Sequence, residues 1–207
     1  MKTQEAILGL DISTHTIGVS LFDVKGNLLD LTHLKPRPKP KPEYKTEELI
    51  KKAEIFEDFL QRFDDYSIIK VIIEEPLINS QNANTVAVLL KFNAMITQKV
   101  YDKYKTVADY ISTENARKFA FPELCQPSRY RKNGQFKPLK ERGKPVLFGA
   151  FPRNWDKKCI ILNKVSKHEP QNIEWAMHKN QKLRKENFDA ADAYTCVLGY
   201  MKMKDIW

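Results

Sequence analysis

Residues 6–22 read AILGLDISTHTIGVSLF, and the rest of the chain is organised around this stretch. It begins as an apolar run ending at Asp11, passes through small polar residues, and resumes as a β-like run from Ile17 to Phe22. This pattern predicts a hairpin whose first strand is buried on both faces. A carboxylate at the end of a buried strand is costly unless something pairs with it, although Asp also commonly caps turns. Gly18 and Ser20 are small, so we expect open space beside Asp11.

Length and composition set the class of protein. The 207 residues suit one α/β domain, and we expect a single domain over residues 1–207. No apolar run approaches the length of a membrane span, and the polar N-terminus lacks a signal-peptide core. Cys125, Cys159 and Cys196 lie far apart without a CxxC pair, which argues against a zinc site and a disulfide framework. We therefore expect a reducing, cytoplasmic location without a membrane partner.

The positive charge is concentrated in one part of the chain. Residues 128–185 contain 16 Lys and Arg against four acids, whereas the formal net charge of the whole chain is +9. Aromatic residues such as Tyr130, Phe136 and Trp155 are interleaved with these cations. A solvated surface is the simpler interpretation, but a basic and aromatic segment favours nucleic-acid binding.

The order of the remaining elements predicts an α/β fold with a mixed five-stranded sheet flanked by helices. Periodicity predicts strands at 27–33, 67–75 and 106–111, and helices at 46–63, 82–104, 112–121, 156–167 and 188–203. Alternating prolines make 35–42 an extended segment. Residues 125–155 are interpreted as a basic insertion with a hairpin at 130–136, and 172–184 as a small hairpin or loop.

Four carboxylates would meet at one end of this sheet if the first and fourth strands are neighbours. Asp11 and Glu74 each end a predicted buried strand, and Asp189 and Asp192 are three residues apart on the last helix, on one face. A bare cluster of this kind is repulsive. Mg²⁺ or Mn²⁺, which prefer oxygen ligands, would stabilise it, and two such ions suit phosphodiester hydrolysis. Glu75 is the alternative ligand to Glu74.

Three segments resemble RuvC-type Holliday junction resolvases of the RNase H-like superfamily. They are the opening ILGLD ending at Asp11, the VIIE ending at Glu74, and the DAADA at 189–193, which is similar to the closing motif of that family. The resemblance implies a homodimer, Mg²⁺ dependence and paired nicks across a four-way junction. The chain departs from the family pattern in two places. At Leu77 the family has an aromatic residue that stacks near the crossover of the junction, and the 125–155 insertion has no counterpart in the family.

We therefore predict a metal-dependent, structure-selective endonuclease that resolves four-way DNA junctions. The predicted catalytic and metal-binding residues are Asp11, Glu74, Asp189 and Asp192, and the predicted nucleic-acid contacts are Arg117, Lys118, Arg129, Arg131, Lys132, Lys157 and Lys158. The expected partners are branched DNA and a second copy bound through helix 82–104, without a small-molecule cofactor. His15 is either a solvated turn residue or an aid to a water molecule. The alternatives are a nuclease of the same fold acting on RNA–DNA hybrids or flaps, and a non-catalytic nucleic-acid-binding module.

Overall fold

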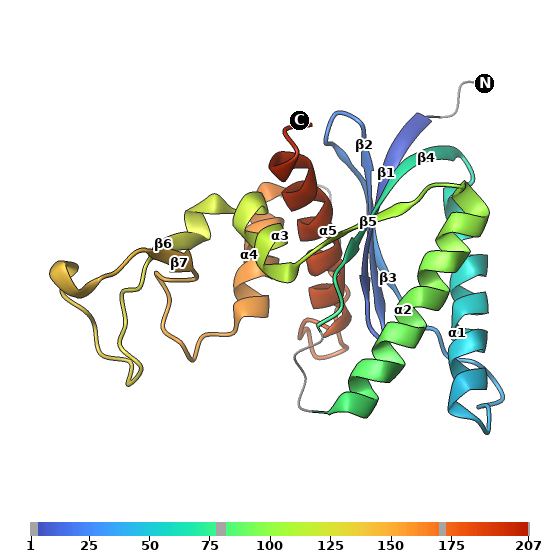
Figure 1. Cartoon of the computed structure of the whole chain (residues 1–207), viewed down its shortest axis with the longest axis horizontal. Helices are drawn as coiled ribbons and strands as arrows, with labels where there is room; N and C mark the ends of the chain where they lie inside the picture. Colours follow the sequence, from blue (N-terminus) through green and yellow to red (C-terminus); the bar gives the residue numbers. More distant parts are fainter. Residues whose placement is uncertain (1–3, 78–81, 170–172, 207) are drawn as a thin grey trace.

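A mixed sheet lies at the centre of the computed structural model, which describes residues 4–77, 82–169 and 173–206 (Figure 1). Its strands are β1 (Gln4–Ile12), β2 (Ile17–Asp23), β3 (Leu28–Leu34), β4 (Tyr66–Glu74) and β5 (Ala108–Ile111), in the order β3-β2-β1-β4-β5. β1 pairs antiparallel with β2 and parallel with β4. β2 pairs antiparallel with β3, and β4 pairs parallel with β5. The predicted five-stranded mixed sheet is confirmed, and the strand that carries Asp11 is its central one.

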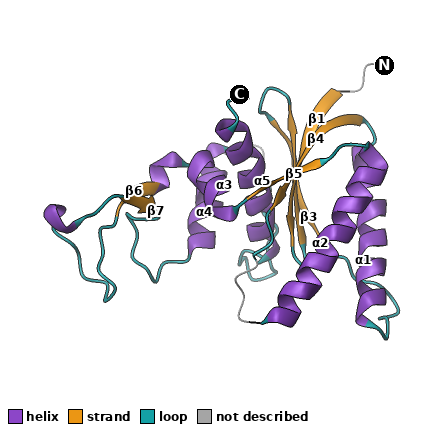
Figure 2. Cartoon of the chain, in the orientation of Figure 1, coloured by secondary structure: helices purple, strands orange, loops and turns teal. Residues whose placement is uncertain are grey.

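Helices cover both faces of this sheet (Figure 2). One face carries α1 (Lys45–Phe59) and α2 (Ala83–Tyr104), and the other carries α3 (Thr113–Ala120), α4 (Lys157–His168) and α5 (Glu186–Met203). Leu8 and Leu10 of β1 pack in the core with α1 and α2, whereas Ile7 packs with the other three helices. The predicted burial of β1 on both faces is therefore confirmed. Among the described helices, none combines the length and apolar character that crossing a membrane requires.

Helix α5 lies unusually close to the sheet because β1 and β2 present very small residues to it. A Cβ atom on Gly9 would lie 2.3 Å from Val197 Cγ2, and one on Gly18 would lie 2.0 Å from the Asp189 carbonyl oxygen. The Ser20 hydroxyl donates to the Ala193 carbonyl at 3.0 Å. The room that Gly18 and Ser20 leave beside Asp11 is therefore present, and the backbone of α5 fills it.

Several helix boundaries follow from capping side chains. The Asn82 side chain accepts from the backbone of Asn84 at 3.0 Å and starts α2, and the Ser112 hydroxyl accepts from Asn115 at 3.3 Å and starts α3. The Asp156 carboxylate accepts from the Lys158 backbone at 2.9 Å and starts α4. The predicted helix 46–63 differs at its end, where Leu60–Phe63 forms a 3₁₀ turn.

The segment 125–155 projects away from the sheet and contains little regular structure (Figure 1). β6 (Cys125–Pro127) and β7 (Pro145–Leu147) form a two-stranded ribbon. The predicted hairpin at 130–136 is present only as a single bridge between Tyr130 and Phe136, closed by a turn with Gly134 at a φ of +84°. Within 173–184, a bridge joins Met177 to Leu183, and Asn172 lies outside the described residues.

Candidate metal centre and nucleic-acid interface

Three carboxylates from three different elements meet at the carboxyl end of β1 and β4. The parallel register pairs Leu10 with Ile73, so the next residues, Asp11 and Glu74, lie side by side. Asp192 reaches the same place from α5, and one carboxylate oxygen of each of the three acids lies within 4.8 Å of the others. Carboxylate oxygens at this separation are hard ligands that suit Mg²⁺ or Mn²⁺.

The acids disturb one another's protonation, as expected for a cation site. Burial and then the charges of Glu74, Asp192 and Asp189 hold the pKa of Asp11 well above its usual range. Burial and the charge of Asp192 raise the pKa of Glu74 to about 6. Both shifts record that negative charge is disfavoured here, and a divalent cation would remove that penalty. The donor set therefore fits a divalent cation.

Neighbouring side chains hold two of these acids in place. Arg117 Nη2 donates to Asp192 Oδ1 at 2.8 Å, and the Thr113 hydroxyl donates to Glu74 Oε1. The Cys196 thiol lies 3.7 Å from Glu74 Oε2. The Arg117 side chain is only 13% exposed. The Arg117 guanidinium is turned inward to Asp192 in this structure, and its predicted contact with a DNA phosphate stays a prediction.

Asp189 lies beside the three-acid cluster but does not belong to it. Its Oδ1 is 3.5 Å from Lys158 Nζ, and burial raises its pKa despite this neighbour. Burial opposes protonation of Lys158, yet the carboxylates of Asp192, Asp189 and Asp11 raise its pKa. Glu75, the alternative to Glu74, is exposed beyond the end of β4, so the glutamate that meets the other acids is Glu74.

The other predicted nucleic-acid contacts are spread over the α3–α4 side of the molecule. Lys118, Lys132 and Lys157 are exposed. Arg129 donates to Gln126 at 2.6 Å, and Arg131 pairs with Glu141 at 2.7 Å. Among the predicted lysines and arginines, Lys158 and Arg117 are the two that contact the acidic residues in the described structure. The DNA-binding roles of the others stay predictions.

Leu77 and His15 both follow strands of the central sheet, and both are exposed. Leu77 follows β4 and is 67% exposed. His15 is an exposed turn residue whose Nδ1 lies 3.1 Å from the Thr14 hydroxyl. Among the described residues, no hydrogen bond or ion pair joins either side chain to Asp11, Glu74 or Asp192.

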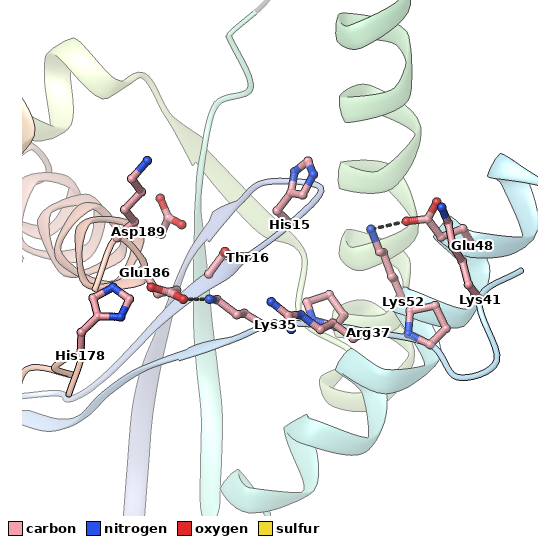
Figure 3. Close-up of a pocket in the computed structure, with 13 residues that line it drawn as sticks. His15, Thr16, Lys35, Arg37, Lys41, Glu48, Lys52, His178, Glu186 and Asp189 are labelled. Atoms are coloured by element: carbon pink, nitrogen blue, oxygen red, sulfur yellow. Dashed lines mark ion pairs between the residues drawn. The ribbon is translucent and has the colours of Figure 1, made fainter. Parts of the chain in front are cut away.

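Sequence reasoning did not identify a cavity of about 660 Å³ that opens beside Asp189 (Figure 3). Cations of the proline-rich segment, Lys35, Arg37 and Lys41, line it together with Lys185. The order of the strands predicts where this proline-rich segment lies. β3 runs antiparallel to β2 and its last residue, Leu34, pairs with Ile17, so the chain that follows must start at the same edge as Asp11.

Comparison with known proteins identifies the fold. No protein-family model and no curated protein matches this sequence. Among solved structures, RuvC from Thermus thermophilus is similar at a TM-score of 0.52 and 15% identity, with 96% of each chain covered. RuvC of the same organism in complex with a Holliday junction substrate is similar at a TM-score of 0.50 and 13% identity, covering 97% of this chain and 95% of that one. At these identities the likeness concerns the fold, and this chain therefore has the RuvC fold, as its three acidic segments predict.

Proposed function

We propose that this chain is a divalent-metal-dependent endonuclease that resolves four-way DNA junctions by paired hydrolysis of phosphodiesters. The observation that carries the proposal is the meeting of Asp11, Glu74 and Asp192 within 4.8 Å at the carboxyl end of two parallel strands. The RuvC fold supports it, since one of the similar proteins was solved with a Holliday junction substrate. The net charge of +9 supports a polyanionic substrate.

In this proposal, each residue of the site has a definite task. Asp11, Glu74 and Asp192 hold one or two divalent cations, and Asp189 borders them. Bound ions of this kind activate water and stabilise a leaving oxygen at a phosphodiester. Arg117 orients Asp192 at 2.8 Å and limits repulsion among the acids. Lys158, whose side chain is half exposed and 3.5 Å from Asp189, is free to contact a phosphate next to the acids.

The proposal includes a homodimer, because paired cleavage of a two-fold junction needs two active sites. Helix α2 is the proposed interface. Its outer side exposes Leu90 and Tyr101, which are 42% and 44% exposed, and it lies on the face of the sheet opposite α5 (Figure 2). The exposed cations Lys118, Arg129, Arg131, Lys132 and Lys157 are proposed to position the arms of the junction through their phosphates.

The test compares three substrates with and without Mg²⁺. Labelled four-way junction, linear duplex and RNA–DNA hybrid are incubated with the protein and separated on a denaturing gel. The expected result is Mg²⁺-dependent, symmetrically paired cleavage of the junction alone, which is lost in Asp11→Asn while junction binding is retained. Efficient cleavage of the hybrid without junction preference would assign the hybrid nuclease instead, and full activity of Asp11→Asn would refute the metal site.

A further inference from the structure

A basic groove opens beside Asp189, the acid that borders the three-acid cluster (Figure 3). Four segments form it: the β1–β2 turn, the proline-rich chain after β3, the start of α1, and the loop that leads into α5. Asp189 lines the groove, and its backbone rests on Gly18, which pairs with Asp11 of the three-acid cluster. The groove therefore lies next to the proposed active site.

Two of the cations in the groove stabilise the fold. Lys52 is buried, and its Nζ bonds Glu48 at 2.6 Å and the Thr14 carbonyl at 2.7 Å, which ties α1 to the β1–β2 turn. Lys35 forms an ion pair with the buried Glu186. These two pairs neutralise both glutamates that line the groove.

The remaining cations have no such partner. Arg37, Lys41 and Lys185 are exposed, and no ion pair joins them to a carboxylate among the described residues. The positive charge in and beside the groove also changes the pKa values of neighbouring residues. After burial, the charges of Arg184 and Arg37 lower the pKa of Lys35, and Arg184 and Lys35 lower the pKa of His33. With both glutamates neutralised, the groove presents an excess of positive charge beside an acidic cluster.

We infer that this groove binds the phosphodiester backbone of the DNA strand that is cut. This inference rests on the proposed function. It adds a DNA-binding surface that is separate from the lysines and arginines named there. Arg37, Lys41 and Lys185 each contact a phosphate, since they are the cations with free donors. The prolines of this segment fix the backbone that carries Arg37 and Lys41, so little conformational freedom is lost on binding.

The experiment compares two triple variants with the same loss of charge. The groove variant is Arg37→Ala/Lys41→Ala/Lys185→Ala. The control variant is Lys25→Ala/Lys167→Ala/Lys204→Ala, whose three lysines are exposed and lie outside the groove. Binding of a fluorescent four-way junction and of a single-stranded oligonucleotide is measured by anisotropy in EDTA between 50 and about 300 mM KCl, a range wide enough to give a salt slope.

The groove variant is expected to bind the junction about tenfold more weakly than wild type, with the slope of log K against log salt reduced by about 2.7, at about 0.9 for each of the three lost phosphate contacts. The control variant should change the slope by less than about 0.5, since its lysines lie outside the groove. In Mg²⁺ and at saturating protein, the groove variant should also cut the bound junction more slowly than the control. Equal melting temperatures of the three proteins check folding, and Arg37→Glu alone gives the same comparison if the triple variant is unstable.

The outcomes separate this inference from the proposed function. Equal slopes for the groove and control variants, on both ligands, would overturn the groove assignment and leave the nuclease assignment intact. A wild-type protein that binds DNA through the groove but does not cut the junction would support the groove and contradict the proposed function. Salt-independent or absent DNA binding by the wild type would overturn both.

Discussion

Replacing Glu74 by Gln should stabilise the metal-free protein, because the acid pays an electrostatic penalty in the fold. Burial and the charge of Asp192 raise its pKa from 4.5 to about 6. A shift of this size corresponds to about 2 kcal/mol of destabilisation once the acid is ionised. For a chain of this length that is about 4–8 °C in melting temperature. Gln keeps an oxygen that can accept from Thr113, so the substitution removes the charge and retains that hydrogen bond.

The sign of the pH dependence follows from the direction of the shift. Below about pH 4.5 Glu74 is protonated in both the folded and unfolded states, and the penalty vanishes. It develops as the pH rises from 4.5 to about 6 and is complete above that value. The gain in Glu74→Gln should therefore be largest at pH 7.5 and clearly smaller at pH 5.

The assay is thermal denaturation in EDTA at both pH values, with Glu75→Gln as the matched control, since Glu75 is the exposed neighbour and loses the same charge. Mg²⁺ should raise the melting temperature of the wild type more than that of Glu74→Gln, which has lost one ligand. The reasoning is refuted if Glu74→Gln is no more stable than wild type at pH 7.5, or if Glu75→Gln gains as much.

Two further substitutions test the architecture of the site, and one mass measurement tests the proposed dimer. Arg117→Ala should lower the free energy of unfolding by about 3 kcal/mol in urea titrations without metal, because Asp192 loses its buried partner, and Mg²⁺ should restore part of the loss. Gly18→Ala should cost about 2 kcal/mol and reduce cleavage, because the new Cβ would lie 2.0 Å from the Asp189 carbonyl; Gly143→Ala, which meets nothing within 4 Å, is its control. Light scattering should give the mass of a dimer, and a monomeric mass with and without junction DNA would contradict the paired-site proposal.

The sequence was sufficient to predict the sheet and two of its acids because strand pairing is a strong constraint. A buried apolar run must lie inside the sheet, and parallel neighbours end at the same edge. Asp11 and Glu74 each follow such a run directly, and the register that pairs Leu10 with Ile73 brings them together. Only the order of the strands was needed for this part of the site.

The sequence could not separate Asp189 from Asp192, because their spacing places both on one helix face. The difference arises from how α5 lies on the sheet. The backbone of Asp189 rests on Gly18, which belongs to β2 and pairs with Asp11 across the hairpin. Asp192, one turn later, reaches the gap between Asp11 and Glu74. The inward orientation of Arg117 likewise depends on packing between helices, where α3 approaches α5 so closely that a Cβ on Gly199 would lie 2.3 Å from the Ala116 carbonyl oxygen.

The distribution of charge around the acidic edge accounts for how the proposed site could accept a polyanion. An acidic cluster that attracts a divalent cation also repels phosphate, so further cations are needed to bring a DNA strand across it. Here Lys158 lies 3.5 Å from Asp189, and Asp189 also lines the groove that carries Arg37 and Lys185. A strand held by both Lys158 and the groove would reach the acids with its phosphates already neutralised. Loss of either contact should therefore slow cleavage of the bound junction, even where the three-acid cluster is intact.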